Sequence, residues 1–76
     1  MNNERRKSLT EVKDQIEDIK DALQELLDAE EEYLDSIPEN MQSSERYEKA
    51  DESVSALEEA VSSLEDAADS IDTAIE

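Results

Sequence analysis

Residues 51–74 of the chain read DESVSALEEAVSSLEDAADSIDTA, and the apolar residues in this stretch are spaced alternately three and four positions apart. The same spacing begins earlier, at Tyr47, and continues to Ile75. The full set is Tyr47, Ala50, Val54, Leu57, Val61, Leu64, Ala68, Ile71 and Ile75. Such a heptad repeat lines up apolar side chains on one stripe of an α-helix, where another helix can pack. It predicts a helix over about residues 44–75.

A second heptad repeat precedes this one and predicts a helix over about residues 3–36. Its members are Leu9, Val12, Ile16, Ile19, Leu23, Leu26, Tyr33 and Ile37. Glu30 occupies the one polar position of this repeat. A carboxylate among apolar residues is costly to bury, so we expect Glu30 to set the register of the helices. A buried contact with a partner and simple exposure to water remain alternatives.

The segment between the two repeats, about residues 37–43, predicts a tight turn. Pro38 disfavours helical geometry at the residue before it, so the first helix should end near Ile37. Ser36 and Glu39 stand at the spacing of a capping box, and Ser43 or Ser44 can cap the second helix. So short a connection makes two neighbouring helices antiparallel. We therefore predict one domain over residues 1–76, an all-α antiparallel helical hairpin, or two-helix coiled coil. Near the bend we expect four large apolar side chains to cluster: Tyr33, Ile37, Met41 and Tyr47.

The residues that flank the two repeats predict ion pairs on one side of the hairpin. There Lys13 should face Asp72, and Lys20 should face Glu65. At the open end, we expect the basic cluster Arg5–Lys7 to form a clamp with three acidic residues of the second helix, Asp69, Asp72 and Glu76. Each helix end alone carries charges that oppose its own dipole, and the two ends together compensate one another.

The other flank is built from small residues, which widen the apolar stripe beyond what two helices can cover. We therefore predict a homo-oligomer, most simply a dimer of hairpins that forms a four-helix bundle. The residues expected to mediate self-association are Ala22, Ala29, Leu27, Leu34, Ala60, Ala67 and Ala74.

Composition argues against an enzyme. The 76 residues include no His, Cys or Gly. These absences exclude thiolate and imidazole chemistry, zinc sites, phosphate-binding loops and dinucleotide fingerprints. We predict no cofactor and no bound metal. The chain also lacks an apolar run of the ~20 residues that cross a bilayer and an apolar segment behind its basic N-terminus. The expected location is the cytoplasm, with no contact to membranes.

Charge gives the main indication of a partner. The chain has 24 acidic and 7 basic residues, for a net charge of −17. On a rod of about 45 Å this is one net charge per roughly 2.6 Å, compared with one per ~1.7 Å in duplex DNA. Such charge repels nucleic acid and anionic membranes and attracts a basic protein. The acidic residues expected to bind that protein are Asp28, Glu31, Glu32, Asp35, Asp51, Glu52, Glu58, Glu59, Glu65 and Asp66.

The segment IPENMQSSERYEKAD, residues 37–51, follows an acidic heptad helix that opens with NNERRK. In this combination the chain resembles very small acidic helical-hairpin proteins of phages and mobile elements, whose function is unassigned. The resemblance implies a counter-defence role, because small acidic phage proteins often mimic nucleic acid and block host restriction or CRISPR machinery. The leading hypothesis is thus a non-catalytic inhibitor or decoy for a basic, nucleic-acid-binding protein. The alternative is a structural or adaptor coiled coil that works through its apolar face, with acidity serving only solubility.

Overall fold

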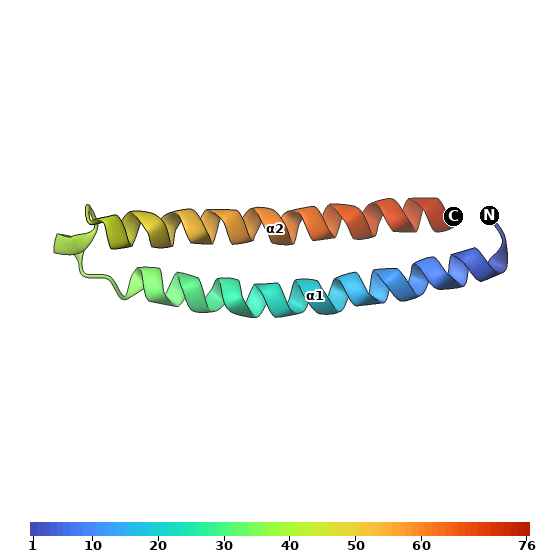
Figure 1. Ribbon diagram of the computed structural model, residues 1–76, viewed down its shortest axis with the longest axis horizontal. Helices are drawn as coiled ribbons and strands as arrows, with labels where there is room; N and C mark the ends of the chain where they lie inside the picture. The colour runs from blue at the N-terminus through green and yellow to red at the C-terminus, as the bar shows by residue number, and fades with distance from the viewer.

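The computed structural model describes all 76 residues, which form two long helices. Helix α1 spans Asn3–Asp35 and helix α2 spans Glu45–Ile75, with a short 3-10 turn, η1, at Glu39–Met41. The helices lie side by side and antiparallel, so both termini are at one end of the molecule and η1 is at the other (Figure 1). The chain is therefore an all-α hairpin, a rod of 59 × 15 × 13 Å.

Polar side chains at the helix ends explain where the helices begin. Asn2 caps α1, because its Oδ1 accepts a hydrogen bond of 2.8 Å from the backbone N–H of Arg5. Ser44 caps α2 in the same way, and its Oγ accepts from the N–H of Tyr47 at 3.3 Å. The predicted capping box at the bend is wrong. Ser36 instead ends α1, where its hydroxyl donates to the carbonyl of Tyr33, and η1 has no side-chain cap.

Helix α2 packs through the apolar residues that its heptad repeat identifies. Ala50, Val54, Val61 and Ala68 are buried. The other members of the repeat are half-buried: Tyr47, Leu57, Leu64, Ile71 and Ile75. The centre of the interface is formed by Val54 and Val61 against Leu27 of α1. The rotation of α2 about its axis is thus the one that its sequence predicts.

Helix α1 is rotated relative to the predicted orientation. One row of the repeat, Leu9, Ile16, Leu23, Glu30 and Ile37, faces α2 as expected, and each member is half-buried or buried. The second row in the interface is Lys13, Lys20, Leu27 and Leu34, here called the Lys13 row. The predicted second row is exposed: Val12 at 43%, Ile19 at 53%, Leu26 at 61% and Tyr33 at 43%. We call these four residues the Val12 row.

Two features of the chain favour this rotation of α1. It brings Lys13 and Lys20 toward the acidic side of α2, which has no basic residue after Lys49. Their aliphatic stems can cover apolar surface while the ammonium groups stay in water. It also buries Leu27, which is 4% exposed, instead of the Tyr33 ring, whose hydroxyl would need a hydrogen-bond partner in the interface.

The bend is closed by fewer side chains than the sequence predicts. Ile37 is buried and Tyr47 is half-buried, whereas Tyr33 and Met41 are exposed. The predicted cluster of four is therefore wrong for Tyr33 and Met41. The rotation of α1 carries Tyr33 away from α2, and the extended backbone at Pro38 leads into η1, where Met41 remains in water.

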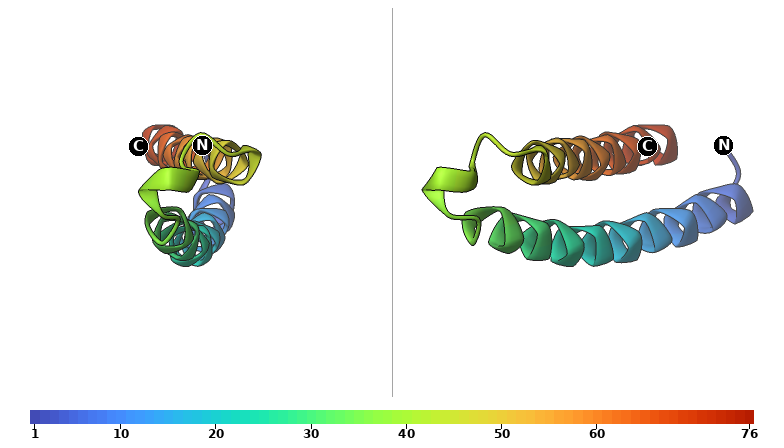
Figure 2. Two further views of the ribbon diagram at one scale, coloured as in Figure 1. Left: turned by 90° about the vertical axis from the view of Figure 1, so that its left-hand side faces the viewer. Right: turned by 60° about the vertical axis from the view of Figure 1, so that its left-hand side comes forward.

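The hairpin buries little of its own surface. Only 6 of the 76 residues are buried, and all six are apolar. The accessible surface is 5625 Å², whereas a compact monomer of 8.6 kDa exposes about 4,700 Å² by size scaling. Viewed along the rod, α1 and α2 form a single layer, and no third long helix covers either side of it (Figure 2). Neither helix contains an apolar stretch long enough to span a membrane.

Candidate functional site

The two long sides of the hairpin, each formed by side chains of both helices, differ in chemistry. An ion pair between the helices shows which rows share a side. Lys13 Nζ lies 2.6 Å from Asp72 Oδ1, so the Lys13 row and the row that contains Asp72 share one edge. We call this the acidic edge. On α2 it carries Asp51, Glu58, Glu65 and Asp72 at intervals of seven residues, all exposed. A neighbouring row on the outer side of α2 adds Glu52, Glu59 and Asp66, which are also exposed. Six predicted partner-binding residues are thus brought together along α2.

The four predicted partner-binding residues of α1 also gather in one place. Asp28, Glu31, Glu32 and Asp35 line a shallow hollow in the surface near the bend, together with Glu25 and Ala29. Five carboxylates therefore surround this hollow, and no basic residue lines it. The backbone of α1 positions them on successive turns, because residues three and four apart are neighbours on a helix surface. The hollow can offer carboxylate oxygens to a cationic group.

Few of the carboxylates are neutralised within the chain. Of the 24 acidic residues, only three form an ion pair. The pairs are Lys13–Asp72, Lys20–Glu17 and Lys49–Glu45. The predicted pair of Lys20 with Glu65 is wrong. Lys20 Nζ instead lies 3.1 Å from Glu17 Oε2, one turn away on the same helix. The predicted partner-binding acids therefore all lack an ion-pair partner.

Both interface lysines respond to this acidic surrounding. The hydrogen bond to Asp72 raises the pKa of Lys13 above its usual value. The hydrogen bond to Glu17 raises the pKa of Lys20, and the nearby charge of Glu65 adds a smaller contribution in the same direction. The charged form of each ammonium group is thus favoured by the carboxylates around it.

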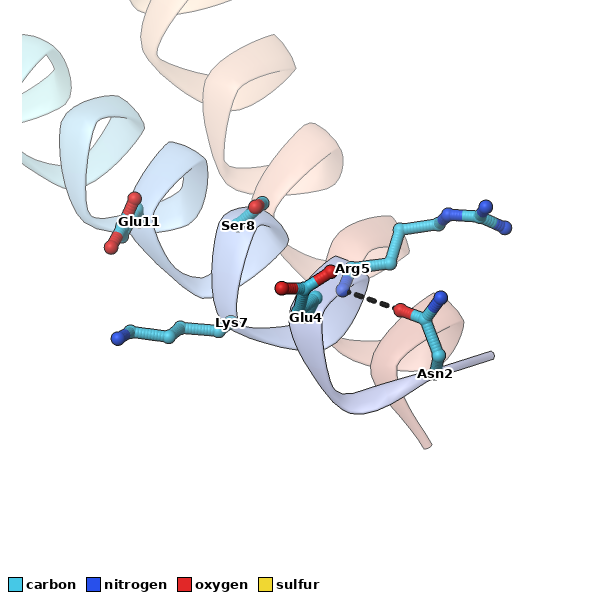
Figure 3. A pocket seen from close by; sticks show the side chains of 6 residues that line it. All are labelled: Asn2, Glu4, Arg5, Lys7, Ser8 and Glu11. Atoms are coloured by element: carbon cyan, nitrogen blue, oxygen red, sulfur yellow. Dashed lines mark hydrogen bonds between the residues drawn. The ribbon is translucent and has the colours of Figure 1, made fainter.

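The basic cluster at the N-terminus makes one contact with α2, and it is not the predicted one. Arg6 Nε donates a hydrogen bond of 3.1 Å to the backbone carbonyl of Ile75. No ion pair joins Arg5, Arg6 or Lys7 to the three acidic residues of the expected clamp. Asp72 is occupied by Lys13. Arg5 and Lys7 extend away from each other beside a surface hollow that Glu4, Ser8 and Glu11 also line (Figure 3). Arg6 thus satisfies a free carbonyl at the end of α2, as a cation at a helix C-terminus should.

The opposite edge of the hairpin is uncharged, and we call it the uncharged face. On α1 it consists of the Val12 row and, farther out, Gln15, Ala22 and Ala29. On α2 it consists of the row Ser53, Ala60, Ala67 and Ala74 and, farther out, Ala56, Ser63 and Ser70. None of these residues is charged, in a chain of which 41% is charged. The uncharged face thus differs from the acidic edge on the other side, although Ala29 at its outer margin borders the acidic hollow near the bend.

The predicted self-association residues divide between this face and the hairpin's own interface. Ala22, Ala29, Ala67 and Ala74 are exposed on the uncharged face, and Ala60 is half-buried at its inner margin. Leu27 is buried and Leu34 is half-buried between the helices, so these two are used within the hairpin. Sequence reasoning missed the Val12 row, because the heptad repeat assigns it to the hairpin interface. The adjacent leucines at 27 and 34 were the available signal that α1 has two possible packing rows.

Glu30 lies on the interface side of α1 but is only half-buried, so water still reaches its carboxylate. It forms no ion pair. No three carboxylates of the molecule converge in an arrangement that could hold a metal ion. The hairpin thus exposes two surfaces that other molecules could bind, one of carboxylates and the other of apolar side chains. No protein-family model, curated protein or solved structure matches the chain.

Proposed function

We propose that the protein is a non-catalytic acidic ligand for a basic protein, and specifically a nucleic-acid mimic that occupies a nucleic-acid-binding surface. The observation that carries this proposal is the acidic edge, where Asp72 alone has an ion-pair partner, Lys13. The other carboxylates of this edge repeat along α2 and form no ion pair within the chain. The proposal also draws on the resemblance to small acidic proteins of phages and mobile elements. In such a protein, an acidic surface of this kind could block a host-defence nuclease.

The charge density of the rod supports a basic partner. Seventeen net negative charges over 59 Å correspond to one charge per about 3.5 Å. This charge density is lower than the one charge per roughly 2.6 Å expected for a rod of about 45 Å, and it is about half the density of duplex DNA. The carboxylates are concentrated on the acidic edge and the outer sides, so the local density there exceeds the average. A basic groove would be attracted to that edge, and salt would weaken the attraction.

The test is affinity capture of partners with the full chain, from cells that naturally express it, followed by mass spectrometry and a salt titration of each complex. We expect a nucleic-acid-binding protein whose complex weakens between about 50 and 300 mM salt and is displaced by duplex DNA. A variant with Glu58→Gln, Glu59→Gln, Glu65→Gln and Asp66→Asn should bind at least about tenfold more weakly. The matched control removes four charges near the N-terminus: Glu4→Gln, Glu11→Gln, Asp14→Asn and Asp18→Asn. Recovery of no basic protein, or equal weakening by both variants, would contradict the proposal.

A second candidate function is a structural or adaptor module that works through the uncharged face, and the exposure of the Val12 row favours it. In this function the protein self-associates, and two hairpins form a four-helix bundle. Support comes from the accessible surface, which exceeds that of a compact monomer by about 900 Å². Removing carboxylates on the acidic edge would leave such a function intact, whereas a charge on the uncharged face would abolish it.

A further inference from the structure

We infer that the uncharged face is the seam of a two-fold symmetric dimer, in which the Val12 row of each hairpin packs on the Ala60–Ala67–Ala74 row of the other. This inference rests on the second candidate function and assigns the surface and the arrangement that would carry it. It also changes the residue set expected from the sequence. Leu27 and Leu34 are not part of the seam, whereas Val12, Ile19, Leu26 and Tyr33 are.

The uncharged face is large enough to form a dimer interface. From Val12 to Tyr33 the face is about 33 Å long, at 1.5 Å per helical residue. The hairpin is 15 Å wide, so the face covers about 500 Å² per copy in projection. Two copies would bury about 1,000 Å² or more, which reaches the lower limit of a specific protein interface. Burial of this size accounts for more than half of the surface that each hairpin exposes in excess of a compact monomer.

The charge of the chain restricts where two copies can meet. A chain with a net charge of −17 repels a second copy, so any self-contact must exclude the carboxylates. The Val12 row and the Ala60–Ala67–Ala74 row of the uncharged face let two copies meet without a carboxylate in either row. Packed there, each copy keeps its acidic edge in water and directed away from the other copy. A basic protein is a poor occupant of the two packing rows, because neither the Val12 row nor the Ala60–Ala67–Ala74 row carries an acidic side chain to pair with.

The shape of the uncharged face favours one arrangement of the two copies. The Lys13–Asp72 ion pair sets the helices level with each other, so Ile19 lies about level with Ala67, and Leu26 with Ala60. Each hairpin therefore presents a row of large side chains on α1 beside a row of small ones on α2. A two-fold axis parallel to the rod places α1 of one copy over α2 of the other at the same level. Ile19 and Leu26 then pack on the small side chains of Ala67 and Ala60 of the second copy.

The alternative two-fold axis, perpendicular to the rod, fits this face less well. It would place α1 over α1, with Ile19 against Leu26 of the second copy. Large residues would then hold the α1 helices apart while the alanine rows faced one another across a gap. Interiors pack without such voids, and large residues interdigitate with small ones. Both axes make every neighbouring pair of helices antiparallel, as in common four-helix bundles, so the packing of large on small residues is what favours the parallel axis.

The test is the mass of the full chain in solution, by light scattering and sedimentation over a range of concentrations. We expect 17.2 kDa, twice 8.6 kDa, at concentrations in the tens of micromolar and moderate salt. Ile19→Glu and Ala67→Glu should each weaken the dimer by at least about 100-fold, because a carboxylate would be buried unpaired in the seam. Both residues are exposed in the hairpin, so helix content by circular dichroism should be retained. The matched control Ser62→Glu adds the same charge to an exposed site outside the face and should remain dimeric.

The arrangement is tested with cysteine variants, since the natural chain has no cysteine. A mixture of Leu26→Cys and Ala60→Cys chains, treated with a short thiol-specific cross-linker, should give mixed dimers in high yield. Leu26→Cys mixed with Ile19→Cys should not, and preferential cross-linking of that pair would overturn the proposed axis. A mass of 8.6 kDa at all concentrations, or a dimer insensitive to both glutamate variants, would overturn the seam itself. None of these measurements needs the basic partner, so each proposal can fail without the other.

Discussion

Lys13 and Asp72 form an ion pair that joins α1 to α2 across 59 positions of sequence, with Lys13 Nζ 2.6 Å from Asp72 Oδ1. It is the only side-chain ion pair between the helices. The pair links one edge of α1 to the acidic row of α2 and leaves the Val12 row on the opposite edge. The ion pair thus marks which residues of α1 and α2 lie at the same height along the rod. It also marks the side of the hairpin that carries the acidic edge, opposite the uncharged face.

The first prediction concerns this contact. Lys13→Met keeps the aliphatic stem and removes the charge, and it should lower the midpoint of thermal unfolding slightly, as should Asp72→Asn. The double variant should be less destabilised than the sum of the two, because each single change already removes the pair. Lys49→Met is the control. Its ion pair with Glu45 spans 4.0 Å within α2 and is exposed, so its effect should be close to zero. Strict additivity of the two interface changes would show that the pair does not contribute.

The second prediction is the pH dependence of the same contact. The hydrogen bond to Asp72 raises the pKa of Lys13 above 10.5, its ordinary value. A group whose pKa is higher in the folded state binds its proton more tightly there, so its contribution is complete below pH 10.5 and is lost as pH rises through the raised value. The difference in unfolding free energy between the natural chain and Lys13→Met should therefore be constant from about pH 8 to 10 and shrink above that. A difference that persists unchanged at pH 12 would contradict this.

The third prediction tests the rotation of α1 with two neighbouring leucines. Leu27 is 4% exposed and Leu26 is 61% exposed. Leu27→Ala should cost about 2–5 kcal/mol of unfolding free energy, because it leaves a cavity beside Val54 and Val61. Leu26→Ala should change the stability of the single hairpin by about 0.5 kcal/mol or less. Both are measured by urea unfolding in a chain that also carries Ala67→Glu, so that a second copy does not contribute. Equal costs would mean that both rows share the interface.

Much of the fold is predictable from the sequence, and the rotation of α1 marks where prediction stops. The heptad repeat of α2 has a single apolar row pair, so Val54 and Val61 could be assigned to the interface directly. On α1 two adjacent rows compete, one with Leu26 and Tyr33 and the other with Leu27 and Leu34. A repeat-based reading chooses the more apolar row. The chain instead packs through the row that contains Lys13. The ion pair with the acidic helix α2 stabilises a lysine at this position, and a pattern of apolar residues alone does not take such a contact into account.

The candidate site follows the same division. Positions of the exposed acids on α2, such as Glu58 and Glu59, follow from the helix period alone, and so does their lack of a basic neighbour. The uncharged face could not be predicted in full, because its large residues are exposed only in the orientation of α1 that the structure shows, and not in the orientation that the heptad repeat predicts. The pairing of Lys20 was also out of reach. Glu17 and Glu65 are both near enough in principle, and the local geometry of the side chain decides in favour of Glu17.

The fourth prediction concerns the N-terminus of α2. Ser44 Oγ accepts the N–H of Tyr47, one of the donors that has no partner within the helix. Ser44→Ala should therefore lower the unfolding free energy by about 1 kcal/mol. Ser43→Ala removes an identical hydroxyl from the adjacent position, where the side chain is exposed and caps nothing, and it should be nearly neutral. If Ser43→Ala costs as much as Ser44→Ala, the start of α2 lies one residue earlier than in the structure.

The fifth prediction is that salt stabilises the folded protein. Two electrostatic effects of opposite sign compete, since salt screens both the repulsion among carboxylates and the attraction within ion pairs. The chain has 24 acidic residues but only three ion pairs, so relief of repulsion should dominate. The thermal midpoint should rise as sodium chloride increases from about 20 to 500 mM, most steeply below 150 mM, where the screening length changes most. The variant that neutralises residues 58, 59, 65 and 66 has less repulsion to relieve and should show a smaller rise. A flat or falling midpoint would mean that the carboxylates are too far apart to repel one another, and the same spacing would then weaken the case for an acidic edge that attracts a basic groove.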